Sequence, residues 1–121
     1  MPPHRPPTIS THVLDNERGQ PAVGVRVTLE RRDDDGLSIM LEAATNADGR
    51  VDDLLDGPLE GGVYWISFDA AGYFSSQGAR QDGEVPFLRT VTIEFEIVDT
   101  HRHYHVPLLM TRYACTSYRG S

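Results

Sequence analysis

Apolar residues recur at every second position along much of this chain. From Val23 to Leu29 every odd-numbered residue is Val or Leu, and from Val91 to Ile97 every odd-numbered residue is apolar, with Thr and Glu between them. Side chains of a β-strand point alternately to opposite faces, so this period places one face in a core and the other in water. The pattern therefore predicts half-buried antiparallel strands over 23–31 and 89–98.

Less regular alternation predicts four more strands, over 9–15, 37–45, 62–69 and 104–110. Sequences rich in Gly, Pro, Asn and Asp separate the strands, and the run Asp-Asp-Asp-Gly at 33–36 predicts a hairpin. A short helix is predicted over 70–78, where the strand pattern stops. Seven or eight short strands with turns between them are typical of an all-β protein with a β-sandwich fold.

Composition and charge restrict the class of protein. The chain has 121 residues, enough for one domain with a single core, and its 39% hydrophobic and 24% charged residues are typical of a soluble globular protein. A formal net charge of −7 argues against nucleic acid as a partner, because phosphates attract surfaces rich in Lys and Arg. No apolar run approaches the roughly 18 residues that a membrane span requires, so no membrane partner is expected.

The first residues and the one cysteine bear on where the protein works. Residues 1–10 (MPPHRPPTIS) lack the apolar segment of a signal peptide, which predicts a cytoplasmic protein. Their prolines predict a disordered tail over 1–8, with the folded domain over 9–121. A single cysteine, Cys115, cannot form an intramolecular disulfide, which fits a reducing compartment, and we interpret it as a small apolar core residue.

Histidines supply the candidate chemistry. His101, His103 and His105 are two residues apart, so they share one face if the strand begins early enough, and His12 lies in a predicted strand near the other end. Two of them with a third ligand, such as His12 or a carboxylate, suit Zn²⁺, although no zinc motif accompanies them. A strand histidine is more often an ordinary polar residue, and His101 fits the preceding loop better. The residues alone leave both interpretations open.

Three segments, taken in order, resemble the signature sequences of a known family. They are ISTHVLDNERGQPAVGVRVTLE at 9–30, TNADGR at 45–50 and HYHVPLLMTRYACTSYRGS at 103–121. The family is that of 5-hydroxyisourate hydrolase, the transthyretin-related enzyme of urate breakdown. The resemblance extends from Ile9 to Ser121, and the occurrence of all three segments in this order makes it specific.

This resemblance implies a fold, an assembly and a reaction. The fold is a transthyretin-like (prealbumin-like) β-sandwich of two four-stranded sheets with one short helix. The assembly is a homotetramer with active sites between subunits. The reaction is hydrolysis of a small-molecule substrate, 5-hydroxyisourate, to 2-oxo-4-hydroxy-4-carboxy-5-ureidoimidazoline, without a metal or other cofactor. A transthyretin-like carrier of small ligands and a zinc-dependent hydrolase are the alternatives.

The resemblance also implies roles for particular residues. The implied catalytic residues are His12, Arg50, His105 and Ser121, and the implied substrate-binding residues are His103, Tyr118, Arg119 and Gly120. Imidazole titrates near neutral pH, so His12 and His105 are expected to share the proton transfers, with the base left unassigned between them. Arg50 offers a planar, permanently charged group to an anionic purine-like ring. Ser121 is expected to orient water or substrate through its hydroxyl or its terminal carboxylate.

Overall fold

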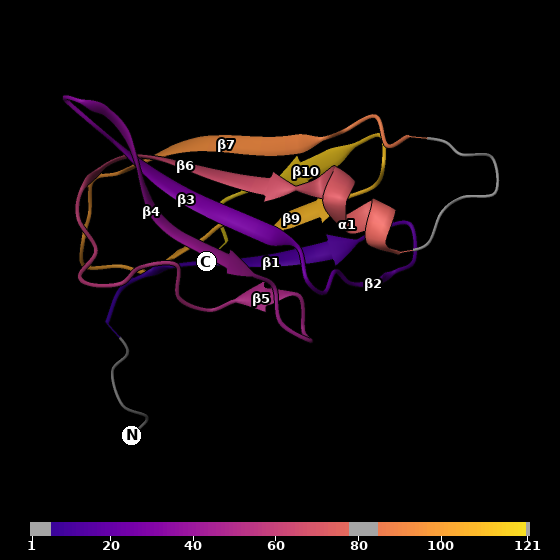
Figure 1. The fold of residues 1–121 in the computed structure, drawn as a ribbon. Coiled ribbons are helices and arrows are strands. Elements are labelled where there is room, and N and C mark those ends of the chain that lie inside the picture. Colours follow the sequence, from indigo (N-terminus) through magenta and orange to yellow (C-terminus); the bar gives the residue numbers. More distant parts are fainter. Residues whose placement is uncertain (1–5, 78–84, 121) are drawn as a thin grey trace, which may run out of the picture.

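Two β-sheets pack face to face in this computed structural model, which describes residues 6–77 and 85–120 (Figure 1). The first sheet is antiparallel, with its strands in the order β4 (Gly36–Ala44), β3 (Arg26–Asp33), β6 (Gly62–Asp69) and β7 (Thr90–Ile97). The Asp-Asp-Asp-Gly run joins β3 to β4, with Asp33 opposite Gly36, so the predicted hairpin is confirmed.

The second sheet is built around β1 (Ile9–Asp15). Its other segments are β2 (Gln20–Pro21), β5 (Arg50–Val51), β8 (Tyr104–His105), β9 (Leu108–Met110) and β10 (Cys115–Ser117). Along one edge of β1, first β8 and then β9 pair with it in parallel. Along its other edge, first β5 and then β2 pair with it antiparallel. The outermost segment, β10, pairs with β9. The six segments therefore occupy four strand positions across the sheet: β10, then β8 with β9, then β1, then β5 with β2.

Short interruptions explain why this sheet has more segments than the sequence indicates. The predicted strand over 104–110 is divided into β8 and β9 at Val106 and Pro107, and proline has no N–H to donate to a neighbouring strand. Both β2 and β5 have two residues and β10 has three, which is too short to show a period of two. The prediction of a sandwich of two sheets with one short helix is confirmed.

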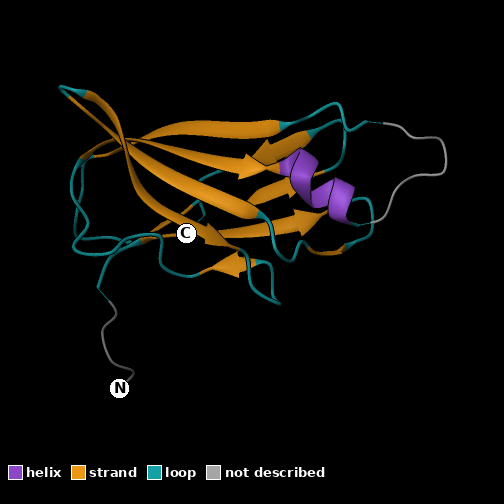
Figure 2. Cartoon of the chain, in the orientation of Figure 1, coloured by secondary structure: helices purple, strands orange, loops and turns teal. Residues whose placement is uncertain are grey.

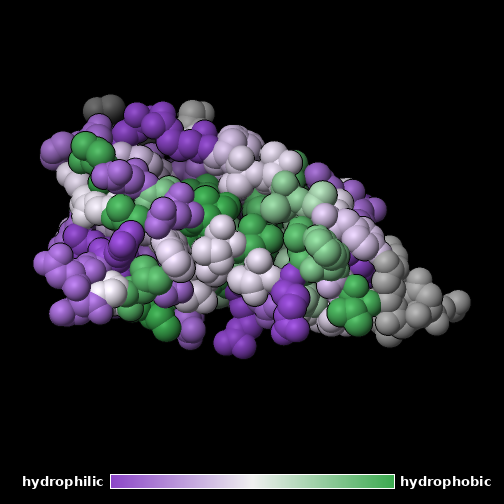
Figure 3. Space-filling view, turned by 90° about the horizontal axis from the view of Figure 1, so that it is seen from above, coloured by the Kyte–Doolittle hydropathy of each residue, from purple (hydrophilic) through white to green (hydrophobic). Residues whose placement is uncertain are grey.

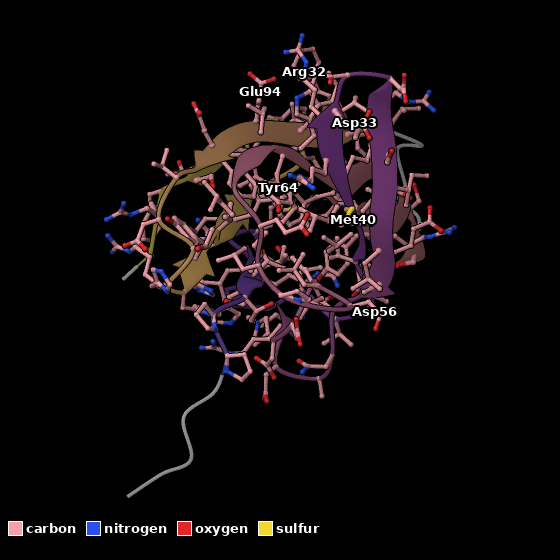
Figure 4. The ribbon with its side chains drawn as sticks, turned by 90° about the vertical axis from the view of Figure 1, so that its left-hand side faces the viewer. Arg32, Asp33, Met40, Asp56, Tyr64 and Glu94 are labelled. Atoms are coloured by element: carbon pink, nitrogen blue, oxygen red, sulfur yellow. The ribbon has the colours of Figure 1, made fainter. Side chains whose placement is uncertain are left out.

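The core lies between the two sheets and follows the alternating pattern. In β3, Val27 and Leu29 are fully buried, and in β6 the side chain of Tyr64 is almost fully buried. Figure 4 shows the Tyr64 side chain between the layers, with Arg32 and Glu94 at the outer surface. Each sheet therefore supplies one apolar face to a shared core, as a sandwich requires.

Most predicted strand boundaries agree with the structure within a residue, but 23–31 does not. Val23 is 50% exposed, because Gly24 adopts a φ of 80° and the chain turns there before β3 begins at Arg26. The interpretation of Cys115 as a core residue is also wrong, since it is exposed on β10.

Helix α1 (Ala70–Ser76) lies at one end of the sandwich (Figure 2). Its first turn is capped by Asp69, whose carboxylate accepts a hydrogen bond from the N–H of Gly72. The hydroxyl of Tyr73 donates to Oδ2 of the fully buried Asp15 at 2.8 Å, which fastens the helix to the end of β1. Burial, together with this bond to Asp15, raises the pKa of Tyr73 to about 12, so the phenol remains a donor.

Within residues 6–77 and 85–120, no helix is long and apolar enough to cross a membrane. The predicted tail over 1–8 falls mainly on residues 1–5, outside the described residues, and stays a prediction. Thr8 already belongs to the sheet region, because its carbonyl accepts a hydrogen bond from the N–H of Tyr104 at 2.9 Å.

We expect Gly49→Ala to destabilise the protein more than Gly24→Ala. The two glycines have nearly the same φ, 77° and 80°, where an L-residue costs about 1–2 kcal/mol. At Gly49 a Cβ would also lie 2.6 Å from the carbonyl oxygen of Val13 in β1, whereas a Cβ at Gly24 has nothing within 4 Å. Urea denaturation gives the free energy of unfolding of both variants. If both variants lose the same free energy of unfolding, the close contact of Gly49 with β1 does not matter for stability.

Candidate functional site

Strand β1 carries the candidate site on its outward face. Its β-branched residues Ile9, Thr11 and Val13 favour a strand and are buried, so the alternate residues Ser10 and His12 share the opposite face. The side chain of Ser10 is also buried, by neighbours on that face, while His12 is half-buried. The outward face of the second sheet is therefore where histidine chemistry is available.

The pairing of β1 brings two more side chains to this face. His12 is opposite Arg50 of β5, and Ser10 is opposite His105 of β8. Residues directly opposite each other in neighbouring strands project from the same face of a sheet. Asn46 fixes the turn before β5, because its Oδ1 accepts a hydrogen bond from the N–H of Arg50 at 3.0 Å. Three segments distant in the sequence thus meet at one place.

Ser10 joins two of the predicted histidines. Its Oγ lies 2.7 Å from Nε2 of His103 and 2.8 Å from Nδ1 of His105. His101 does not join them, because β8 begins only at Tyr104 and His101 lies in an exposed turn. The period of two therefore holds for His103 and His105, and the interpretation of His101 as a loop residue is confirmed.

The end of the chain returns to His105. The N–H of Gly120 donates to the carbonyl of His105 at 2.7 Å, in an isolated antiparallel bridge. A Cβ at Gly120 would lie 2.7 Å from Cδ2 of the His105 ring, closer than carbon atoms tolerate. Only glycine allows the backbone to approach the ring this closely. The residue after it, Ser121, lies outside the described residues, and its role stays a prediction.

The two residues before Gly120 also belong to the predicted site. Tyr118 and Arg119 line a cleft of about 500 Å³ together with Phe95, Tyr104 and Val106. Tyr104 and Val106 are buried on the core side of the second sheet, so this cleft opens between the sheets and is separate from the outward face. Tyr118 is 59% exposed. Tyr118 and Arg119 therefore border this cleft, while the next residue along the chain, Gly120, contacts His105.

The electrostatic surroundings favour a neutral His105. Burial lowers the pKa of His105 below its ordinary value, and the neighbouring charges of Arg50, His103 and His12 lower it further. Asp52, which follows β5, acts in the opposite direction. A neutral imidazole beside a guanidinium can accept a proton while the guanidinium attracts an anion. Such a site is suited to attack of water on an electrophile that becomes negatively charged.

Sequence reasoning missed Ser10, although it stands two residues before His12 and so must share its face. A serine in a strand carries no chemical signal of its own, which is why the position gave no indication. In the described part of the chain, no group of three or more His, Cys, Asp or Glu residues is arranged to hold a metal ion.

Comparisons with known proteins give a consistent result. A sequence model of the HIUase/Transthyretin family matches residues 9–120. The chain is 48% identical over 117 residues to a 5-hydroxyisourate hydrolase of Deinococcus radiodurans, covering 95% of this chain and 97% of that protein. A solved 5-hydroxyisourate hydrolase from Klebsiella pneumoniae is similar with a TM-score of 0.80 and 31% identity, over 95% and 99% of the two chains. Sea bream transthyretin in complex with thyroxine is similar with a TM-score of 0.80 and 26% identity, over 93% of both chains.

We expect the pKa of His105, followed by NMR titration, to lie below the ordinary histidine value. Arg50→Gln removes a positive neighbour and should raise this pKa, whereas Asp52→Asn removes a negative one and should lower it further. Arg50→Lys keeps the charge and serves as the control, with a pKa close to that of the unchanged protein. Shifts of the same sign in Arg50→Gln and Asp52→Asn would refute this account of the site.

Proposed function

Because the chain belongs to the HIUase/transthyretin family, we propose that it is an enzyme that hydrolyses 5-hydroxyisourate in the breakdown of urate. The product is 2-oxo-4-hydroxy-4-carboxy-5-ureidoimidazoline, and neither a metal nor another cofactor takes part. The main observation behind the proposal is the group formed by His12, Arg50 and His105 on the outward face of the second sheet. The 5-hydroxyisourate hydrolases among its relatives, matched over nearly their whole length, support the choice of substrate.

The geometry suits hydrolysis of a ring amide. Neutral His105 or His12 takes a proton from water, whose oxygen then adds to the carbonyl carbon and leaves a negative charge on the carbonyl oxygen. Arg50 stabilises that charge with its guanidinium. When the carbon–nitrogen bond breaks, the protonated imidazole returns the proton to the leaving nitrogen. Because the pKa of His105 is lowered, the neutral form that this cycle needs predominates at neutral pH.

A carrier function is the principal alternative within the same family. The sea bream structure is a transthyretin in complex with thyroxine, so the fold alone does not decide between enzyme and carrier. A carrier of a lipophilic ligand needs a largely apolar surface, whereas the outward face here holds His12, Arg50 and two more histidines around Ser10. The side chains on this face therefore favour hydrolysis.

We further infer that the working form is a homotetramer with its sites between subunits. The strands β7 and β10 are terminal in their sheets, and exposed apolar side chains accompany them: Val98 is 80% exposed, Phe87 74% and Tyr118 59%. Figure 3 views the molecule from the β7 side and shows hydrophobic residues gathered in the middle of that face. Association along these edges would bury such residues.

Tyr118 and Arg119 complete the argument for shared sites. Both line a cleft on the single chain, and Tyr118 is exposed there, so in the proposed tetramer this end of the chain contributes to a site shared with a neighbouring subunit. A cytoplasmic location also stays a prediction, supported by a composition with one cysteine.

We expect His12→Ala, Arg50→Ala and His105→Ala each to slow the hydrolysis of 5-hydroxyisourate, by about 10²–10⁴-fold for the histidines. Each substitution removes a proton carrier or the permanent charge from the outward face. The assay adds freshly generated 5-hydroxyisourate and follows its ultraviolet absorbance with and without protein. His101→Ala is the matched control and should keep the full rate, because His101 lies in an exposed turn.

The same assay decides between the alternatives. Decay no faster than the spontaneous rate in the presence of the unchanged protein would remove the proposed activity and leave the carrier. Activity that EDTA abolishes and Zn²⁺ restores would favour the zinc-dependent hydrolase. A folded His105→Ala variant with near-full activity would show that the site has been placed wrongly.

We expect light scattering to give a mass about four times the 13.5 kDa of one chain. The physical reason is the exposed apolar surface beside two terminal strands. Measuring activity in a dilution series on the same sample relates the assembly to the reaction, with activity falling as the tetramer dissociates. A fully active monomer would refute the shared site.

A further inference from the structure

Ser10 lies between His103 and His105, and the hydrolytic cycle proposed above gives a role only to the second of them. It is 7% exposed, and its Oγ lies within hydrogen-bond distance of Nε2 of His103 and Nδ1 of His105. At 2.7 and 2.8 Å, both contacts have the length of full hydrogen bonds. A buried hydroxyl in this position connects the two imidazole rings through hydrogen bonds.

The number of protons restricts how these bonds form. A serine hydroxyl has one proton to donate and two lone pairs that accept. It can donate to only one of the two ring nitrogens, so the other ring must donate to Ser10. Two arrangements result for the neutral rings. In the first, Nδ1 of His105 donates to Ser10 and Ser10 donates to His103. In the second, the directions are reversed.

The two arrangements give His105 opposite chemistry at its other nitrogen. With its proton on Nδ1, neutral His105 has a free lone pair on Nε2 and can act as a base; with its proton on Nε2, it cannot. The ring is oriented by Ser10 on the Nδ1 side and by the backbone of Gly120 against Cδ2. Nε2 is the ring nitrogen that Ser10 does not contact, and it is therefore the one left for proton exchange with water.

We propose that Ser10 is a positioning residue that keeps the proton of neutral His105 on Nδ1 and connects His105 to His103 as a proton relay. This proposal rests on the hydrolytic function proposed above and assigns the base: Nε2 of His105 accepts the proton of the attacking water. Ser10 acts through the two rings and does not itself contact the reacting atoms.

The relay step balances without a further reactant. When Nε2 of His105 has taken a proton, the proton on Nδ1 moves to Oγ of Ser10 while the hydroxyl proton of Ser10 moves to Nε2 of His103. The net result is one proton transferred from His105 to His103, with the hydroxyl restored. The reverse movement returns the proton for the leaving nitrogen.

The charges around the two rings favour this direction of transfer. His105 is half-buried and faces Arg50 from β5 and His12 from β1, both of which disfavour a cation there, while Asp52 favours it. His103 is exposed, so water solvates the positive charge better at that ring.

The first experiment needs no substrate. Nitrogen-15 NMR of the unchanged protein, at a pH where His105 is neutral, distinguishes the two tautomers of each ring. We expect His105 to carry its proton on Nδ1, and Ser10→Ala to give a mixture of both tautomers. Finding the His105 proton on Nε2 in the unchanged protein would overturn the proposal, whatever the protein's activity.

The second experiment measures rates. We expect Ser10→Ala to lower kcat by about 10²-fold with little change in KM, and to alter the acid limb of the pH–rate profile, because His105 then loses its hydrogen bond to the Ser10 hydroxyl. Ser10→Thr keeps the hydroxyl and should recover most of kcat. Thr11→Val is the matched control: it removes a neighbouring buried hydroxyl, which donates to the carbonyl of Val106 at 2.6 Å on the core side.

The outcomes separate the relay from the proposed function. If Thr11→Val reproduces the loss of kcat and the altered pH profile of Ser10→Ala, the effect is structural and the relay is wrong. If Ser10→Ala is folded and hydrolyses 5-hydroxyisourate at the unchanged rate, the relay is wrong while the function stands. If the unchanged protein has no activity, the function fails, and the tautomer measurement still decides whether Ser10 sets the proton on His105.

Discussion

The pairing of β1 along both of its edges is the interaction on which the rest of this structure depends. One edge takes β8 and β9 in parallel, and the other takes β5 and β2 antiparallel, so a single strand orders segments from the whole length of the chain. Its inward residues Ile9 and Val13 are fully buried, which fixes the register, because a slip of one residue would turn them to water. With the register fixed, His12 meets Arg50 and Ser10 meets His105.

Two glycines allow the backbone to close around this strand. Gly49 approaches the carbonyl of Val13, and Gly120 approaches the ring of His105, each at a distance that a side chain would prevent. They act on opposite edges of β1, one before Arg50 and the other beside His105. The same sheet contacts that stabilise the fold therefore set the positions of the reactive groups, so stability and chemistry share their residues here.

How much was predictable depends on whether a feature is local. The predicted bounds of β1 and β6 agree with the structure residue for residue, because apolar residues and flanking turn residues mark both strands locally. Segments such as β5 are too short to show an alternating pattern of apolar and polar residues. They become strands because they pair with β1. The catalytic set came from the resemblance, since spacing alone left zinc open. The role of Ser10 was not predicted, because its hydrogen-bond partners are more than 90 residues away in the sequence. Only the folded structure brings them together.

Within this fold, the side chains on the outward face of the second sheet favour an enzyme over a carrier. A lipophilic ligand gains free energy from apolar contact and loses it when charged groups must be desolvated. The face here holds a guanidinium and three imidazoles, one of which has a lowered pKa because of its surroundings. Such a surface binds a neutral lipophile poorly but stabilises negative charge as it develops, which is the requirement of a hydrolytic transition state. The core residues that position these groups, such as Ile9 and Val13, lie on the other face of the sheet.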